Sequence, residues 1–415
     1  MMLHMKPRYG LPLAAILSVV GIASVAQAGE PQSFDQIARG RDVSIASDCQ
    51  GCHTMPGGLP FAGGLALQTP FGKLVAANIT PDMQTGIGSW TDEDFYNSLH
   101  EGRGKGGELI YPAMPYPAYT KMTYDDAMAL RAYLRTVEPV TQDVVSNQLP
   151  FPFSIRASLN VWNALNFTQG TFKPDPNLSP DANHGAYLVT ALGHCATCHS
   201  GKTSLGADEP KAFLTGGLLQ GWWAPDITGN MRTGIGGWSN DDIVQYLWTG
   251  VNRFSVATGP MMETVTNSTS KMSKEDLGAI ATYLKGIRGD QTAAPPKAAA
   301  DTVLELGKVV YTDNCSMCHV QNGDGVSGLF PKLATNGSVQ SLNATSQIRV
   351  VLQGGRGVST QAAPTAPAMP SFGWKLGDAE IAAALTYVRN SWSNAAPVVE
   401  ASDVKKLRDN LGGAD

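Results

Sequence analysis

The six cysteines of this 415-residue chain fall into three C-x-x-C pairs, and a histidine directly follows each pair. The residues are Cys49, Cys52 and His53; Cys195, Cys198 and His199; and Cys315, Cys318 and His319. Two cysteines at this spacing on a helical turn point the same way, so both sulfurs can form thioethers with one haem. The histidine then lies under the iron as an axial ligand. The pattern predicts three covalently bound haem c groups.

Other uses of C-x-x-C explain the triplet less well. A zinc site needs four ligands, and joining two of the pairs would leave the third unexplained. A redox-active dithiol does not require a histidine at the same position each time. The remaining histidines are not repeated between the units, so we expect them at the surface or beside a site rather than on iron: His4, His100, His184 and His194.

The sixth iron ligand decides between electron transfer and catalysis, because a thioether sulfur raises the reduction potential and closes the iron to oxygen and peroxide. One methionine lies in a proline-containing loop after each cysteine motif: Met114 (YPAMPYP), Met261 (TGPMMET) and Met369 (APAMPSF). The alternative for any methionine is packing in the core or on the surface. Met262 is the rival of Met261, since spacing alone cannot choose between neighbours.

Three arginines follow glycine-rich turns ahead of these methionines: Arg103, Arg253 and Arg356. They could pair with haem propionates, but a solvated turn residue is the simpler interpretation.

The segments that must position these groups recur along the chain. Residues 78–90 recur as 226–238, a shift of 148 residues. Each unit runs from a short helical pattern, through the cysteines and a Gly/Pro-rich stretch, to a closing amphipathic helix. The first patterns cover 34–47, 185–192 and 303–311, and the closing patterns cover 124–136, 274–285 and 378–391. We expect each closing helix to pack on the first helix of its own unit.

The sequence therefore predicts an all-α fold of three tandem class I cytochrome c domains, each a small helical fold around a covalent haem, joined by loop-rich linkers. A low charged fraction of 16% with 45 glycines and 26 prolines agrees with compact, loop-rich domains. The predicted domains are 29–140, 179–289 and 302–395, with an apolar linker at 141–178, an Ala/Pro-rich linker at 290–301 and a C-terminal arm at 396–415.

Two of these segments invite further interpretation. The linker at 141–178 carries Phe151, Phe153 and Trp162 among other apolar residues, too many for a solvated connector. It either packs between the first two domains or forms a surface for a partner subunit or the bilayer. Residues 398–411 show a weak helical pattern with no role that the sequence defines.

Residues 1–28 have the pattern of a secretory signal peptide. Lys6 and Arg8 precede an apolar run, and Ala26-Gln27-Ala28 resembles a cleavage site. An uncleaved anchor is the alternative. Cleavage would remove two basic and no acidic residues, taking the net charge from −5 to −7. A negative chain without a basic stripe is a poor ligand for nucleic acid, so we expect no nucleic-acid partner.

The chain resembles the three-haem cytochrome c subunits of bacterial membrane-bound periplasmic dehydrogenases, which serve alcohol, gluconate, sorbitol, fructose or aldehyde dehydrogenases. The similarity covers nearly the whole mature chain. It rests on segments such as TPFGKLVAANITPDMQTGIGSW, HGAYLVTALGHCATCH and LTGGLLQGWWAPDIT, together with the methionine loops. The resemblance implies that Met114, Met261 and Met369 complete the three haems, which selects Met261 over Met262.

Within this group, FPFSIRASLNVWNALNF followed by TFKPDPN looks most like the subunits that accompany molybdopterin aldehyde dehydrogenases. The resemblance implies a non-catalytic, membrane-associated electron-transfer subunit on the periplasmic side of the cytoplasmic membrane. Its partners would be a large dehydrogenase subunit, a small iron–sulfur subunit and ubiquinone. Long C-terminal apolar anchors of some relatives are missing here, so attachment would be peripheral.

Three other functions compete with this prediction. The chain could serve a PQQ alcohol dehydrogenase or an FAD gluconate, sorbitol or fructose dehydrogenase, or it could be a free periplasmic electron shuttle. A haem peroxidase would need a haem without methionine, and every unit offers one.

Overall fold

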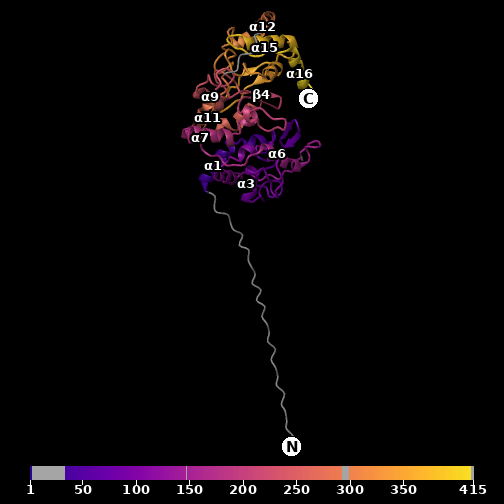
Figure 1. The fold of residues 1–415 in the computed structure, drawn as a ribbon, viewed down its shortest axis with the longest axis vertical. Helices are drawn as coiled ribbons and strands as arrows, with labels where there is room; N and C mark the ends of the chain where they lie inside the picture. The colour runs from indigo at the N-terminus through magenta and orange to yellow at the C-terminus, as the bar shows by residue number, and fades with distance from the viewer. Residues whose placement is uncertain (2–32, 146, 292–298, 413–415) are drawn as a thin grey trace.

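The chain folds into three similar modules that follow one another along the long axis of the molecule (Figure 1). The computed structural model describes every residue except 2–32, 146, 292–298 and 413–415. The predicted signal peptide and most of the predicted 290–301 linker lie outside the described residues. We name residues 33–178 module 1, residues 179–291 module 2 and residues 299–412 module 3.

Each module contains a first helix, a short helix with the C-x-x-C-H motif, a middle helix and a closing helix. Module 1 has α1 (Phe34–Ala46), α2 (Cys49–His53), α3 (Asp92–His100), α4 (Tyr116–Tyr119), α5 (Tyr124–Leu134), η1 (Arg156–Ser158) and α6 (Leu159–Asn166). Module 2 has α7 (Pro180–Tyr187), the π-helical η2 (Leu188–Leu192), α8 (Ala196–His199), η3 (Pro210–Ala212), α9 (Asn240–Thr249), α10 (Pro260–Asn267), η4 (Thr269–Lys271) and α11 (Lys274–Gly286). Module 3 has α12 (Asp301–Asn314), α13 (Ser316–His319), α14 (Thr345–Gln353), α15 (Asp378–Asn390) and α16 (Ala401–Gly412).

The predicted first and closing helices are all present. Their starts follow local capping chemistry: the side chains of Ser33, Thr123, Ser179 and Ser273 each accept a backbone N–H in the first turn of the helix that follows. As expected, α5 packs on α1, α11 on α7 and α15 on α12.

The all-α prediction is wrong in one respect, because each module also holds a two-stranded antiparallel hairpin. The strands are β1 (Ala66–Thr69) with β2 (Gly72–Val75), β3 (Gly217–Leu219) with β4 (Trp222–Ala224), and β5 (Gly355–Arg356) with β6 (Ala368–Met369). In the second hairpin Gln220 and Gly221 both have positive φ, as a tight two-residue hairpin turn requires. Strands of two to four residues are too short for alternation to show in the sequence.

A glycine marks the helix crossing in every module. A Cβ on Gly40, Gly185 or Gly307 would lie only 1.8, 2.0 or 2.1 Å from the carbonyl oxygen of a closing-helix alanine. A tyrosine of the same closing helix is the other close neighbour in each case: Tyr133, Tyr283 and Tyr387. Only glycine allows the two backbones to approach so closely. The three modules therefore share one crossing geometry.

A cationic side chain on each closing helix also donates hydrogen bonds to the loop before the middle helix. Arg131 of α5 donates to the carbonyl of Trp90, and Lys285 of α11 donates to the carbonyls of Gly236 and Trp238. Arg389 of α15 donates to the carbonyls of Val339 and Ser341, both at 2.9 Å. Buried carbonyl groups need such partners, so these bonds fix the middle helix relative to the closing helix.

The apolar segment expected as a linker wraps around module 1. Gln148 pairs with Lys73 of β2, and Trp162 and Phe167 contact the ring of Tyr116 edge-on. Trp162 also donates to the carbonyl of Leu205 in module 2, at 2.9 Å. Packing between the first two modules thus explains part of this segment.

The C-terminal pattern forms the helix α16, which packs on α14 and α15. Val404 is fully buried, and Leu407 and Leu411 pack on the same apolar cluster. Arg408 contacts Asp378 at 2.8 Å and donates to the carbonyls of Gly373 and Leu376. This helix is therefore part of module 3 rather than a free arm.

Candidate haem-binding sites

The three C-x-x-C-H motifs lie on equivalent short helical turns. No disulfide joins the six cysteines, and among the described residues no group of three or more His, Cys, Asp or Glu side chains is arranged to hold a metal ion. Burial raises the pKa of Cys49 and Cys195 to about 12 and that of Cys315 to about 11. A redox-active dithiol needs a lowered thiol pKa, so these apolar surroundings do not fit that chemistry.

Each motif histidine donates its Nδ1–H to a backbone carbonyl. The acceptors are Ala77 at 2.7 Å from His53, Pro225 at 2.7 Å from His199 and Pro331 at 3.0 Å from His319. Since a carbonyl oxygen only accepts, Nδ1 carries the proton and Nε2 keeps its lone pair. Burial also lowers the pKa of all three imidazoles and favours the neutral form. A neutral, oriented imidazole with a free Nε2 is what an iron ligand requires.

The sequence alone did not reveal these carbonyl partners. Ala77 and Pro225 come directly before the repeated segments that begin at Asn78 and Asp226, so the repeat marked their positions without showing their role. Module 3 lacks the repeated segment, so the sequence did not mark the position of Pro331.

The predicted methionine ligands lie in three different kinds of secondary structure. Met114 is in a turn before α4, with its N–H bound to the carbonyl of Tyr111 at 3.1 Å. Met369 is on β6, paired with Gly355. Met261 is in the first turn of α10 rather than in the expected loop, because that helix begins at Pro260. Met261 and Met262 pack on the same apolar cluster, so packing does not choose between them.

Three of the other histidines and two of the turn arginines contact protein groups, whereas His4 lies outside the described residues. His100 stacks on Tyr96 with 4.8 Å between ring centroids, His184 lies 2.6 Å from Asp276, and His194 lies 3.4 Å from the carbonyl of Ser47. Arg103 pairs with Glu101 at 3.5 Å and Arg253 with Asp242 at 2.9 Å, whereas Arg356 is exposed on β5. Protein carboxylates therefore engage two of the three arginines.

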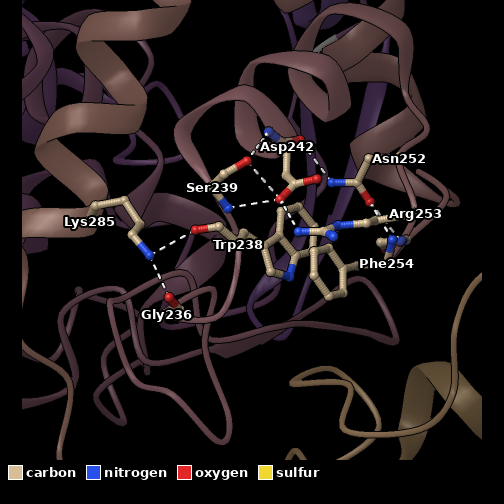
Figure 2. A network of polar contacts seen from close by, with 9 residues as sticks. Gly236, Trp238, Ser239, Asp242, Asn252, Arg253, Phe254 and Lys285 are labelled. Carbon is tan, nitrogen blue, oxygen red and sulfur yellow. Dashed lines mark hydrogen bonds and ion pairs between the residues drawn. The ribbon is translucent and has the colours of Figure 1, made fainter.

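Figure 2 shows a polar network that joins the start of α9 to the turn at 250–255. Asp242 accepts from the N–H and hydroxyl of Ser239, both at 2.8 Å, and from Arg253. Phe254 stacks on Trp238 with 8° between the ring planes. Burial alone would raise the pKa of Asp242, but the Ser239 and Arg253 bonds outweigh it, and the pKa lies below its ordinary value. The network fixes α9 against the turn at 250–255.

The haem-attachment motifs of modules 1 and 2 lie close together. Helix α4, just after Met114, packs on η2 of module 2, and α10, which carries Met261, packs on α2 of module 1. Burial, together with the charges of Asp48 and Cys198, raises the pKa of Cys52 to about 11, which places Cys52 near the second motif. Helix α4 therefore contacts the helix just before the second motif, and α10 contacts the first motif itself.

Modules 2 and 3 also meet, partly through the same helix α10. Val358, between β5 and β6, packs on Ala257, Val265 and the Met261–Met262 pair. Asn336 donates to the carbonyl of Phe254 at 2.7 Å, and Arg349 lies over the ring of Trp222 at 4.7 Å. The methionine segments of modules 2 and 3 are therefore neighbours, and module 2 contacts both other modules.

Comparison with known proteins identifies this architecture. The model of the cytochrome c family matches residues 182–288 and 304–392. The chain is 37% identical to the gluconate 2-dehydrogenase cytochrome c subunit of Pantoea cypripedii, over 94% of this chain and 93% of that one. It is 37% identical to the cytochrome c subunit of the alcohol dehydrogenase (quinone) of Gluconobacter oxydans, over 97% and 88%. It is 35% identical to the fructose dehydrogenase cytochrome subunit of Gluconobacter japonicus, over 98% and 90%.

The fold and the motifs thus define a cytochrome c, a protein that binds haem covalently and transfers electrons. The chain belongs to the cytochrome c subunits of quinone-linked dehydrogenases. The relatives act with gluconate, alcohol and fructose dehydrogenases at nearly equal identity, so the comparison does not favour the aldehyde dehydrogenase partner expected from the sequence. Among the described helices, none has the length and apolar character needed to cross a membrane.

Proposed function

We propose that this chain carries three covalent haem c groups and relays electrons from a catalytic dehydrogenase subunit to ubiquinone at the periplasmic face of the cytoplasmic membrane. The thioether cysteines are Cys49, Cys52, Cys195, Cys198, Cys315 and Cys318. The axial pairs are His53 with Met114, His199 with Met261, and His319 with Met369. The domains are those predicted from the sequence, with α16 added to the third.

The observation that carries this proposal is the threefold recurrence of an imidazole held by a carbonyl beside a free C-x-x-C pair. The family model covers the second and third modules. Module 1 shows the same His53–Ala77 bond and the same glycine at the helix crossing, so it supports a haem of its own.

Different residues attach each haem, orient its histidine ligand and set its reduction potential. A bound haem supplies an iron that exchanges one electron at a time. The two cysteines fix the macrocycle against the short helix, and the carbonyl partner of the histidine sets the ring orientation and raises its basicity. The methionine sulfur raises the reduction potential and keeps oxygen and peroxide off the iron. The contacts between modules support the haem order first, second, third, with the second in the centre.

The partner subunits follow from the relatives, whose names describe subunits of dehydrogenases. We propose a large catalytic subunit that oxidises the substrate and passes electrons to this chain. An aldehyde dehydrogenase with a small iron–sulfur subunit is the partner that the sequence favours. A PQQ alcohol dehydrogenase and an FAD gluconate, sorbitol or fructose dehydrogenase are the alternatives.

Purifying the native complex from membranes tests the proposal. Acetaldehyde, ethanol, gluconate, sorbitol and fructose are offered in turn, while haem reduction and the reduction of a ubiquinone analogue are followed by absorbance. We expect one substrate class to reduce all three haems and then the quinone. The proposal fails if no substrate reduces the haems, or if quinone reduction continues in a complex that lacks this chain.

The same purification separates the subunit from a free shuttle. A shuttle would elute as a monomer without a dehydrogenase, whereas the proposed subunit co-purifies with its large partner in a fixed ratio.

A further inference from the structure

The carbonyl that accepts from each motif histidine is followed by a residue of different charge in each module. The pairs of carbonyl residue and following residue are Ala77–Asn78, Pro225–Asp226 and Pro331–Lys332. The following residue is thus neutral in module 1, acidic in module 2 and basic in module 3. Because it adjoins the peptide group that binds the imidazole, its charge can act on the proposed iron ligand.

Asp226 is a buried carboxylate without a cationic partner. Its Oδ1 accepts from the N–H and the hydroxyl of Thr228 at 2.8 and 2.7 Å, and its Oδ2 accepts from the hydroxyl of Thr233 at 2.9 Å. The residue is 9% exposed, and within the described part of the chain no Lys, Arg or His forms an ion pair with it. A buried charge without a counter-ion costs free energy even when it is hydrogen-bonded.

Asn78 of module 1 makes the same hydrogen bonds without a charge. Its Oδ1 accepts from the N–H and the hydroxyl of Thr80 at 2.9 and 2.8 Å, and its Nδ2 donates to the hydroxyl of Thr85 at 3.0 Å. Asn78 is 3% exposed, so the two positions are also alike in burial. An amide therefore satisfies this loop, and the negative charge in module 2 is not needed to form it.

The charge of Asp226 acts on the imidazole of His199. Burial lowers the pKa of His199, and the carbonyl of Pro225 and the carboxylate of Asp226 both oppose that shift. Burial and the carbonyl act in the same directions on the pKa of His53 and His319, but among the described residues no charged side chain contributes there. A negative charge that favours a more positive imidazole also favours the more positive state of an iron bound to it.

Lys332 of module 3 has a compensated charge. Its Nζ lies 3.2 Å from Oδ1 of Asp324, and the two side chains are 31% and 54% exposed. A nearby opposite charge and the solvent both weaken the field of such a group. Among the three positions, the one in module 2 therefore combines burial with an uncompensated charge.

We propose that the carboxylate of Asp226, acting through His199, lowers the reduction potential of the second haem below the value that a neutral residue would give. The proposal rests on the proposed function, because it needs His199 to be an iron ligand. Reduction adds one electron to the iron and changes no bond, and the nearby negative charge repels that electron. Asp226 is thus a positioning residue for electron transfer. A lowered potential makes the second haem, in the central module, a site that electrons cross rather than one where they accumulate.

Spectroelectrochemical titration of the full-length holoprotein at neutral pH measures the potentials of the three haems. Asp226→Asn removes the charge and keeps a side chain that can make the bonds seen for Asn78. Asn78→Asp places the charge in module 1. Asp241→Asn is the matched control, because it removes the same charge from an exposed position in module 2. Haem content per chain and the methionine–iron charge-transfer band report whether each site stays intact.

We expect Asp226→Asn to raise the potential of one haem. At a fixed electrode potential the ratio of reduced to oxidised iron in that haem should rise about tenfold, which is about 59 mV for one electron. Asn78→Asp should lower the potential of a different haem, and Asp241→Asn should leave all three potentials unchanged. Both shifts should persist at high salt, because buried charges are screened little.

An Asp226→Asn protein with three haems, an intact charge-transfer band and wild-type potentials would overturn this inference and leave the proposed function standing. If that variant loses haem, the Asn78→Asp protein decides, and wild-type potentials there would also overturn the inference. A shift in Asp241→Asn as large as that in Asp226→Asn would trace the effect to net charge and overturn it as well. A wild-type protein with fewer than three haems per chain would instead contradict the proposed function.

Discussion

At the scale of single residues, the proposed haem ligands depend on hydrogen bonds that the C-x-x-C-H motifs do not reveal. His53, His199 and His319 all donate Nδ1–H to a carbonyl supplied by a loop 12 to 26 residues further along the chain. The loop before the middle helix is in turn tied to the closing helix by a cation. A substitution in the loop or the closing helix can therefore alter an iron site without touching iron.

Replacing Met369 by Ala should lower the reduction potential of the third haem and open its iron to carbon monoxide, because the thioether ligand is lost while both cysteine bonds remain. Redox titration and carbon monoxide difference spectra measure the two effects. Met231→Ala is the control, since Met231 is 67% exposed. A titration curve that matches wild type, with no carbon monoxide binding, would show that Met369 is not the ligand.

In the Asp242→Asn holoprotein, the free energy of unfolding should depend less on pH than in wild type. The pKa of Asp242 lies below its ordinary value in the folded state, so its carboxylate stabilises the fold above that ordinary value. This stabilisation is lost as the pH falls through the folded-state pKa, below about pH 4. Thermal unfolding at pH 6 and pH 3 measures it.

At pH 6 the variant should be less stable than wild type by about 1–2 kcal/mol of unfolding free energy, and this deficit should be smaller at pH 3. Asp241→Asn changes an exposed neighbour on the same helix turn and should keep the wild-type pH dependence. An equal deficit of the Asp242 variant at both pH values would contradict the role of the charge.

At the scale of elements, the crossing of first and closing helices is the feature that the modules share most closely. Gly307→Ala should destabilise module 3, because the new Cβ would lie 2.1 Å from the carbonyl oxygen of Ala383 and 2.6 Å from Cβ of Tyr387. Overpacking of this kind costs about 1–3 kcal/mol. Calorimetric melting of the holoprotein measures the change.

The matched control is Gly278→Ala in α11, where an added Cβ meets no atom within 4 Å. Helix propensity should make this variant equal to wild type or up to about 1 kcal/mol more stable. Equal melting temperatures for the two alanine variants would show that the stability of module 3 does not depend on the close approach at Gly307.

Helix α16 should affect the third haem through the segment that follows Met369. Arg408 binds the carbonyls of Gly373 and Leu376 and the carboxylate of Asp378, so it holds the chain between Met369 and α15. In Arg408→Ala the sulfur ligand should dissociate more readily, and the potential of the third haem should fall while haem stays attached. Redox titration and the methionine–iron charge-transfer band are the readouts.

Lys405→Ala is the control, since Lys405 is exposed and pairs only with Asp409 on the same helix. The Arg408→Ala variant could instead have a lower melting temperature but keep the charge-transfer band and the wild-type potential. That result would show that α16 stabilises the fold without affecting the third haem.

The elements that the sequence predicted are those with local signals. The capped, periodic helices around 34–47, 124–136 and 378–391 were predictable because capping and apolar spacing act within a few residues. The hairpins were missed because their strands are two to four residues long. The role of Arg408 and the carbonyl partners of the histidines depend on contacts between distant segments, which one sequence does not display.

At the scale of the whole molecule, module 2 lies in the centre, because it contacts both other modules. Its attachment motif lies beside that of module 1, and its methionine segment packs against module 3.

The proposed relay depends on three haems that are covalently bound to one chain. Mass spectrometry of the purified, acid-denatured protein tests this most directly, because denaturation releases any haem that is not held by thioether bonds. We expect a single species whose mass equals the mature chain plus three haem groups, and a loss of one haem for each cysteine pair changed to serine. A mass with fewer than three haems, or haem released on denaturation, would contradict the account.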